Sequence, residues 1–274
     1  MIRLLLACLA SLLLLGSAMA QSLPPVPAAI RDQGVLRVGV RCDQPPYGYQ
    51  DQGGAFAGVE VDMAKQIAAW IFGDPAKIEI TCVTAENRIP QLIARKVDVL
   101  LATLGITAER ARVIDFTQGY NWGGGDVLVF MDAPIKSMAD LKGKMIASLK
   151  GSTQVAWFEA KMPDVEVLRL NSVSDALQAL KQRRVVGVGV DKATIMVVAS
   201  RDPEMRLLGA PYAVTEGGIG VRKNEADWLA YLNACIERMR AEKLFIPWIE
   251  KVVPVTGNRE LYITAFITKP QLGD

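Results

Sequence analysis

The stretch Val97–Tyr120, VDVLLATLGITAERARVIDFTQGY, carries the pattern that decides the fold. Its apolar run from Val97 to Leu101 is typical of a strand covered on both faces. Thr107 can cap the helical turn that follows, because its hydroxyl can accept a hydrogen bond from a backbone N–H of the first turn. Arg110 then lies near the carboxyl end of a strand, where open α/β sheets bind ligands. It is therefore a candidate for receiving a carboxylate; the alternative is an arginine on a surface loop.

The residues before this stretch alternate between strand and helix patterns. Short β-branched or alternating runs at 35–40 and 78–83 predict strands. Apolar residues at helical spacing predict one helix over 59–72 and another that begins at 84–90. With the strand at 97–101, the order is β-α-β-α-β, which is typical of a doubly wound parallel sheet.

A second set of alternating elements follows the glycines at 123–125, which we expect to be a flexible spot. We therefore predict an α/β protein with two doubly wound lobes joined by a two-strand hinge. Lobe I would comprise 21–122 and 219–274, and lobe II, residues 123–218, would be inserted in it. The crossings are expected near 120–125 and 211–218. The tail at 257–274 shows little periodicity and is expected to wrap the surface.

Charge and composition exclude several classes of function. The 31 Lys and Arg residues nearly balance 29 Asp and Glu residues, so nothing indicates nucleic acid as a partner. The chain contains no histidine, which excludes Ser–His and Cys–His nucleophile pairs and removes the commonest metal ligand. We expect no cofactor and no metal site.

The N-terminus has the features of a secretory signal peptide. Arg3 precedes an apolar run at 4–15, and Ala18-Met19-Ala20 forms an A-x-A cleavage site. The run is too short for a comfortable transmembrane helix, so we expect export and cleavage after Ala20. A lipid anchor at Cys8 is the alternative, but this cysteine lies too early in the apolar run.

The expected mature chain keeps an odd number of cysteines, at Cys42, Cys82 and Cys235. In an oxidising compartment this leaves at least one free thiol or an intermolecular bond. Cys42 and Cys82 each lie near the end of a predicted parallel strand, so a disulfide between them is geometrically plausible. Cys235 lies on an amphipathic helix and is expected to be a buried thiol.

Three further segments place polar or aromatic groups at strand ends. Pro45-Pro46 holds Tyr47 and Tyr49 on a stiff loop, either as packed surface residues or as a pocket wall. A strand runs directly into Gly151–Gln154 and then into a helix, an arrangement that offers hydroxyls and N–H groups to an anion. Asp191 closes an apolar strand, either as a helix N-cap or as a carboxylate that receives a cation.

Facing strand ends from two lobes would form a cleft with arginine on one wall and an acid on the other. That arrangement suits an amino acid, which would be trapped by hinge closure. A binding protein without catalysis is the first hypothesis. An enzyme that uses a carboxylate in the same cleft is the second, since Asp, Glu and Lys can act as acids and bases. A scaffold or sensor ectodomain is a third.

The order of several short motifs resembles the periplasmic amino-acid-binding proteins of ABC importers, often called solute-binding protein family 3. The resemblance covers roughly residues 34–247, and within the family it is strongest to the glutamate/aspartate/glutamine-binding branch. The pieces that carry it are LRVGV at 36–40, PPYGY at 45–49, GVEVDMAK at 58–65, NRIPQL at 87–92, VDVLLATLGITAERARVIDF at 97–116, DLKGK at 140–144, KGSTQ at 150–154 and VDKA at 190–193.

The resemblance implies a fold, a location and a role for matching residues. The fold would be that of type II periplasmic binding proteins, and the protein would be a periplasmic monomer that delivers a free amino acid to a membrane permease. Arg110 would clamp the ligand α-carboxylate and Asp191 would pair with its α-ammonium. Thr103, Gly105, Ser152 and Thr153 would complete the carboxylate site, Tyr47 and Tyr49 would pack on the ligand, and Arg41 and Arg88 would favour an acidic side chain or its amide.

The sequence departs from the family pattern at Gly105 and at Gly187, where the family commonly has an aspartate. The family usually has Thr or Ser where Gly105 stands here, and that hydroxyl helps to hold the carboxylate or ammonium of the ligand. Cyclohexadienyl dehydratases resemble the same family, but their second-lobe loop has consecutive glycines followed by Thr-Asn-Glu. Here the loop is Gly151-Ser152-Thr153-Gln154, without that glutamate.

Overall fold

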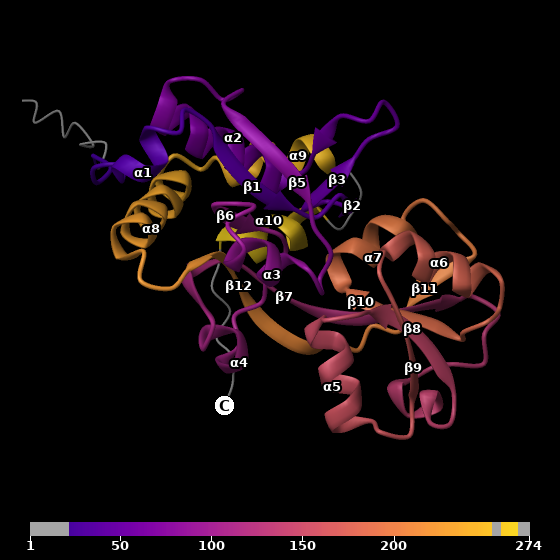
Figure 1. The fold of residues 1–274 in the computed structure, drawn as a ribbon. Helices are drawn as coiled ribbons and strands as arrows, with labels where there is room; N and C mark the ends of the chain where they lie inside the picture. Colours follow the sequence, from indigo (N-terminus) through magenta and orange to yellow (C-terminus); the bar gives the residue numbers. More distant parts are fainter. Residues whose placement is uncertain (1–21, 254–258, 268–274) are drawn as a thin grey trace, which may run out of the picture.

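The computed structural model describes residues 22–253 and 259–267 (Figure 1). The predicted signal peptide lies outside these residues. One half of the molecule, called the β1 half, is built largely from the N-terminal part of the chain. Its elements are α1 (Ala28–Arg31), β1 (Leu36–Val40), β2 (Asp43–Gln44), β3 (Gly48–Gln50), β4 (Phe56–Ala57), α2 (Val59–Phe72), β5 (Ile78–Cys82), α3 (Arg88–Ile93), β6 (Val99–Leu101), α4 (Ala108–Ala111), α8 (Ala226–Ala241), α9 (Phe245–Val252) and α10 (Arg259–Ile267).

The other half, called the β8 half, is built from the middle of the chain. Its elements are a 3-10 turn η1 (Met138–Leu141), β8 (Met145–Leu149), α5 (Thr153–Lys161), β9 (Glu166–Leu170), α6 (Val173–Lys181), β10 (Gly187–Asp191), α7 (Lys192–Ala199) and β11 (Met205–Leu207). Two long strands, β7 (Ile114–Phe130) and β12 (Tyr212–Arg222), run from one half into the other, as Figure 1 shows.

Most of the strands form one continuous sheet in the order β5-β1-β6-β12-β7-β10-β8-β9, in which β11 also pairs with β7, and β2, β3 and β4 form a separate small sheet. β1 lies parallel to β5 and β6, as the β-α-β-α-β pattern predicts, and β8 lies parallel to β9 and β10. β7 and β12 pair antiparallel along most of their length, from Ile114 with Arg222 to Gly125 with Tyr212. The carboxyl ends of the parallel strands of the two halves therefore face each other.

The glycines at 123–125, predicted to be a flexible spot, form no break between secondary-structure elements. The glycines lie inside the continuous strand β7, because β12 pairs with this stretch on one side and Gly125 pairs with Asp191 on the other. A side chain at Gly124 or Gly125 would collide with Tyr212 of β12: a Cβ at Gly124 would lie 2.8 Å from the carbonyl oxygen of Tyr212. Glycine here permits close approach of two strands.

Helices cover both faces of the sheet in each half, as a doubly wound architecture requires. In the β1 half, α2, α8, α9 and α10 bury one large apolar cluster against β1, β6 and β12, and α3 lies over a smaller cluster on the other face. In the β8 half, α6 and α7 pack on one face, and α5 and η1 on the other.

The described part of the tail, residues 259–267, forms the helix α10, contrary to the prediction that the tail wraps the surface. Tyr262, Ile263 and Phe266 of α10 are buried in the core of the β1 half. Their spacing of three to four residues is helical, but two short apolar turns are a weak signal in a sequence of this length.

The cysteines behave as expected. A disulfide joins Cys42, just after β1, to Cys82 at the end of β5, with a Cα–Cα distance of 5.5 Å. Cys235 is a free, buried thiol on α8, and burial raises its pKa to about 12. The disulfide ties together two strand ends that border the meeting place of the halves.

Candidate functional site

Two small cavities lie where the two halves meet, at the carboxyl ends of the parallel strands. Each has a volume of about 20 Å³, which accommodates little more than a water molecule. Both are lined by Thr103, Gly105, Asp191 and Thr215, so they are two parts of one region, which we call the inner site. The predicted residues that line one or both cavities are Tyr47, Thr103, Gly105, Asp191, Arg41, Arg88, Ser152 and Thr153; Arg110 and Tyr49 line neither.

Asp191 is positioned at the end of β10, where the chain turns into α7. It occupies the N-cap position of α7, but its side chain makes no capping hydrogen bond. Instead its carboxylate accepts hydrogen bonds from Gln44 Nε2 of the β1 half and, at 3.4 Å, from Gln154 Nε2. Burial raises the pKa of Asp191, while Arg41 and Arg88 oppose this shift. The carboxylate therefore faces the inner site and not its own helix.

Gln44 and Glu60 belong to the same network and were missed by the sequence reasoning. Gln44 is fully buried, and its Oε1 accepts a hydrogen bond from Thr103 Oγ1 at 3.1 Å. Glu60 Oε1 accepts from the backbone N–H of Thr103 at 2.7 Å and from the Tyr120 hydroxyl. Thr103 has a φ of +49°, an unusual value for threonine, and this network holds it there. The sequence did contain one indication of the role of Glu60, because this acidic residue lies on the apolar face of α2.

Arg41 and Arg88 are both buried, but they differ in their partners. Arg41 pairs with Asp43, with Nη2–Oδ distances of 2.9 and 3.1 Å, so its charge is largely balanced. Arg88 donates only to the carbonyl oxygens of Ala102 and Thr103, and its Nε has no partner among the described residues. Burial lowers the pKa of Arg88 well below its usual value, and repulsion from Arg110 and Arg41 adds to the effect. An anionic or carbonyl oxygen in the inner site would relieve this unfavourable charge.

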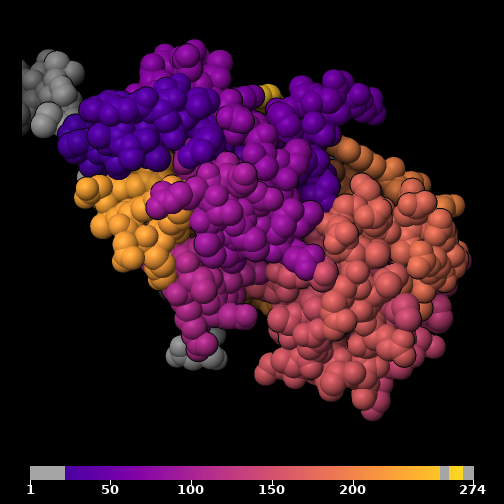
Figure 2. All heavy atoms as spheres, in the orientation of Figure 1, coloured from indigo at the N-terminus to yellow at the C-terminus, as the bar shows by residue number. Residues whose placement is uncertain are grey.

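Arg110 lies just outside the inner site. The Thr107 hydroxyl accepts the backbone N–H of Arg110 at 3.2 Å, as predicted for the cap. The guanidinium donates to Gly105 O at 2.8 Å and, across the halves, to Gly151 O at 3.0 Å. It lines a larger outer pocket of about 420 Å³ between α4 and α5, where Figure 2 shows the surface hollowed. Arg110 thus separates the outer pocket from the inner site.

The loop before α5 forms the opposite wall. Ser152 is the N-cap of α5, and its hydroxyl accepts the Val155 N–H at 3.2 Å, so it is engaged in starting the helix. Thr153 and Gln154 follow on the first turn and line the inner site. Gly151 has a φ of +77°, and a Cβ there would lie 2.8 Å from the Cα of Glu86 in the β1 half. Close approach of the halves therefore depends on glycine at this position.

Gly105 has a physical explanation in its neighbour Thr215. A Cβ at residue 105 would lie 2.8 Å from Thr215 Oγ1 and 3.5 Å from Arg110 Nη1. Thr215, on β12, lines both cavities. Its hydroxyl thus occupies the space that a side chain at position 105 would fill. No motif in the sequence indicates this pairing, because the two residues are 110 positions apart.

The two tyrosines of the PPYGY motif take different places. Tyr47 is buried, lines the inner site and packs on Phe266 of α10, with ring centroids 5.9 Å apart. Tyr49 is partly buried on the small β2-β3-β4 sheet, with Asp51 and Asp62 among the charges near it. The structure therefore brings Tyr47, and not Tyr49, to the inner site.

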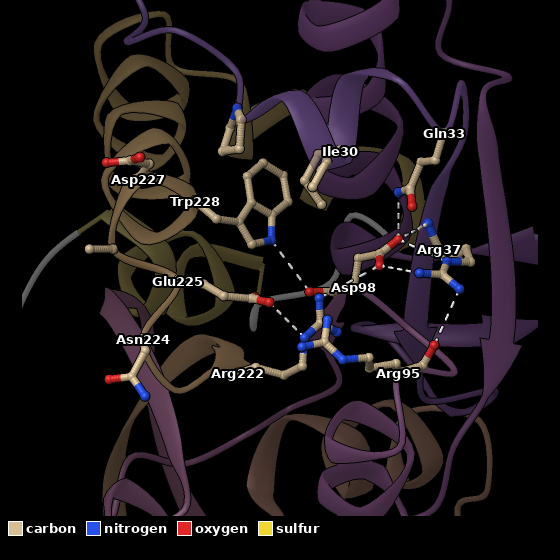
Figure 3. A pocket seen from close by; sticks show the side chains of 13 residues that line it. Ile30, Gln33, Arg37, Arg95, Asp98, Arg222, Asn224, Glu225, Asp227 and Trp228 are labelled. Carbon is tan, nitrogen blue, oxygen red and sulfur yellow. Dashed lines mark hydrogen bonds and ion pairs between the residues drawn. The ribbon is translucent and has the colours of Figure 1, made fainter.

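Another pocket, of about 250 Å³, lies in the β1 half away from the inner site (Figure 3). At its centre the Asp98 carboxylate accepts hydrogen bonds from Gln33 at 2.7 Å and Arg37 at 2.6 Å, and Arg222 pairs with Glu225 at 2.7 Å. These charges satisfy one another and tie α1, β1 and β12 together. The pocket is best explained as a structural network.

Within residues 22–253 and 259–267, no group of three His, Cys, Asp or Glu side chains is arranged to hold a metal ion. In the same part of the chain, no helix combines the length and hydrophobicity needed to cross a bilayer.

The fold, with two α/β halves, two connecting strands and a site between strand ends, is that of type II periplasmic binding proteins. The chain belongs to the bacterial extracellular solute-binding proteins, family 3, whose model matches residues 36–251. This membership confirms the predicted family and the prediction of a binding protein rather than an enzyme. The helix α10 lies beyond the matched residues.

Individual relatives support the same assignment. The ABC transporter glutamine-binding protein GlnH of Bacillus subtilis is 31% identical over 242 residues, covering 86% of this chain and 89% of that protein. The glutamine-binding protein of Geobacillus stearothermophilus is 34% identical over 201 residues, covering 73% and 77%. The crystal structure of the solute receptors for L-cysteine of Neisseria gonorrhoeae has a TM-score of 0.81 and 33% identity, covering 85% of this chain and 95% of that one.

Proposed function

We propose that this protein is the extracytoplasmic receptor of an ABC importer and that it captures a polar amino acid, either acidic or the corresponding amide. The observation that carries the proposal is that opposite charges from the two halves line one cavity. Asp191 of the β8 half faces Arg88 of the β1 half, and Arg110 lies beside both cavities. The ammonium group of an amino acid would pair with Asp191, and its carboxylates would pair with Arg88 and Arg110.

In this proposal the α-ammonium replaces the Gln44 and Gln154 amides at Asp191. The α-carboxylate takes up donors of Arg110 that now contact the carbonyl oxygens of Gly105 and Gly151. The side chain of the ligand extends toward Arg88, whose guanidinium has no carboxylate partner among the described residues. Burial makes each of these pairings stronger than it would be in water.

Binding requires the halves to separate, because cavities of about 20 Å³ are too small for an amino acid. We propose that residues 21–122 with 219–274, and residues 123–218, act as the two lobes and that the middle of β7 and β12 is the hinge. The contacts that would break on opening include Gln44–Asp191, Arg110–Gly151, Lys150–Glu86 at 2.6 Å and Asp43–Val173 N at 2.9 Å.

The mature chain would then be a periplasmic monomer that delivers its ligand to a membrane permease. Two of the relatives named above are glutamine-binding proteins, and the third is a solute receptor for L-cysteine. These names support a free amino acid as the ligand. The finer choice of an acidic or amide side chain rests on Arg88, because Arg41 is already paired with Asp43.

The test is a thermal-shift screen of the mature protein against the individual amino acids, followed by calorimetry. A ligand at 100 times its Kd stabilises the native state by about 2.7 kcal/mol and raises the melting temperature by several degrees. We expect the largest shifts with glutamate, aspartate or their amides. Equal shifts with glutamate and leucine would reject the assigned side-chain class, and no shift with any amino acid would reject the receptor proposal.

A further inference from the structure

The C-terminal helix α10 lies behind the connecting strands, on the residues that join the two halves. It packs against α9 and β7, and its buried residues are Tyr262, Ile263 and Phe266. Figure 1 shows it in yellow close to β7 and β12. Because the family match ends at residue 251, this helix is an addition to the part of the chain that the family defines.

One end of α10 is anchored in the β1 half. The Phe266 ring packs among Tyr47, Tyr120 and Phe245, with centroid distances of 5.9, 6.3 and 5.5 Å. Tyr47 is the residue of this group that lines the inner site. Phe266 therefore supports one wall of the inner site from behind.

The other contact of α10 crosses to the β8 half. The Tyr262 hydroxyl donates a hydrogen bond to the carbonyl oxygen of Ala193 at 2.8 Å. Ala193 lies in the first turn of α7, two residues after Asp191. The bond thus fixes the start of the helix whose N-cap residue faces the inner site.

A cavity of about 180 Å³ remains beside this bond. It is bounded by α10, by Trp122–Gly124 of β7 and by the first turns of α7. Met196 and Val197 of α7 also belong to the apolar cluster that contains α10, so α7 contacts the β1 half through side-chain packing as well as through the Tyr262 bond.

We propose that α10 is a positioning element for ligand capture, and that Tyr262 holds α7, and hence Asp191, in the closed arrangement of the halves. This proposal rests on the proposed function, in which Asp191 contacts the ligand. Tyr262 acts through Ala193 and Asp191 and does not touch the ligand itself. Loss of the bond should open the ligand-free protein and speed ligand release.

The test compares Tyr262→Phe with Tyr231→Phe. Each change removes one hydroxyl from a buried tyrosine of the β1 half, but Tyr231 lies on α8, and its hydroxyl lies beside the Cys235 thiol of the same helix and makes no hydrogen bond to the described residues of the β8 half. Spin labels on Arg112→Cys and Ala160→Cys, both exposed and on opposite sides of the outer pocket, report the separation of the halves. In the mature chain Cys235 is buried and Cys42 and Cys82 form the disulfide, so labelling is selective.

We expect Tyr262→Phe to shift the ligand-free distance distribution toward longer distances. We also expect it to raise the ligand dissociation rate about fivefold, the effect of one net hydrogen bond, while the melting temperature stays close to that of Tyr231→Phe. Identical ligand-free distributions for Tyr262→Phe and wild type overturn the proposal, whether or not a ligand has been found. If the distances lengthen but the wild type binds no amino acid, the proposed ligand is rejected and the role of α10 in holding the halves stands.

Discussion

The Gln44 amide and the Asp191 carboxylate are joined by a hydrogen bond that crosses between the two halves of the molecule. Gln44 is fully buried, and the carboxylate makes no bond to its own helix. The amide donor therefore stands where a ligand ammonium would be received. This single contact decides between the two interpretations of Asp191 in favour of a group directed into the inner site.

Replacing Asp191 with Asn should reduce affinity for amino acids about 100-fold, because the amide keeps the size of the side chain but loses the charge that pairs with an ammonium. Calorimetry of the variant measures the loss. Asp132→Asn is the matched control, since Asp132 is an exposed carboxylate of the same half that pairs with Arg183. Unchanged affinity in Asp191→Asn would mean that the ligand ammonium binds elsewhere.

Arg110→Ala should abolish measurable binding, a loss on the order of 3 kcal/mol or more, because a desolvated carboxylate would lose its charge-assisted donors. Arg112→Ala serves as control, since that residue is exposed on the same turn. Titration calorimetry of both variants with the ligand found in the screen gives the comparison. If Arg110→Ala and Arg112→Ala bind alike, the carboxylate is held by other groups, of which Arg88 is the first candidate.

Gly105 and Thr215 should behave as a coupled pair. Gly105→Ala places a methyl group 2.8 Å from the Thr215 hydroxyl and should weaken binding by deforming the inner site. Thr215→Ala removes that hydroxyl and should also weaken binding. The double variant relieves the collision, so its loss should be smaller than the sum of the single losses by about 1 kcal/mol. A double-mutant cycle on the binding free energies measures this term, and strict additivity would show that the contact has no energetic consequence.

Gly151→Ala should weaken ligand binding at least about tenfold, because the new Cβ would meet the backbone of Glu86 as the halves close. Gly143→Ala is a close control. Gly143 has a similar φ of +69°, but nothing lies within 4 Å of the position that a Cβ would take. Both variants should lose about 1 kcal/mol of folding stability from the left-handed backbone. Only Gly151→Ala should lose affinity, and equal affinities would show that closure does not press these segments together.

Glu60 should make folding stability depend on pH. Burial raises the pKa of Glu60 to about 7, even though hydrogen bonds from Tyr120 and Thr103 favour the charged form. For an acid whose pKa is higher in the folded state, the native protein binds the extra proton. Its contribution to the free energy of unfolding is therefore fully present below about pH 4.5 and is lost as the pH rises through about 7, a change on the order of 3 kcal/mol.

Urea unfolding at pH 5 and pH 8 tests this for wild type and Glu60→Gln. The glutamine cannot ionise, so the variant should lose much of the decline in stability between the two pH values. A wild-type protein whose decline is unaltered by the substitution would assign the pH dependence to other groups.

Local sequence pattern was sufficient to predict the order of elements. The runs at 36–40, 78–82 and 99–101 are apolar strands separated by helical periods, and parallel pairing of β1 with β5 and β6 follows from that alternation. The Thr107 cap and the placement of Asp191 at a strand end are also local, because they depend on a few neighbouring residues.

Contacts between distant residues were not predictable in this way. The glycines of β7 carry no local signal that β12 would pair with them, so one continuous strand over Ile114–Phe130 was not predicted. The role of α10 depends on Phe266 reaching Tyr47 and on Tyr262 reaching Ala193, across separations of 219 and 69 residues. Gln44 belongs to no motif, and its role is evident only from its hydrogen bond to Asp191, 147 residues away.

The stretch Val97–Tyr120 shows the same difference between local features, which the sequence predicts, and long-range contacts, which it does not. By itself the sequence determined a strand, a capped turn and an arginine at a strand end, because backbone periodicity and capping are short-range. Only the tertiary structure decided that Arg110 would bond to Gly151 of the other half, and that Gly105 would make room for Thr215. The physical reason is that charge pairing and close packing depend on which surfaces meet, and that is set when the two halves come together.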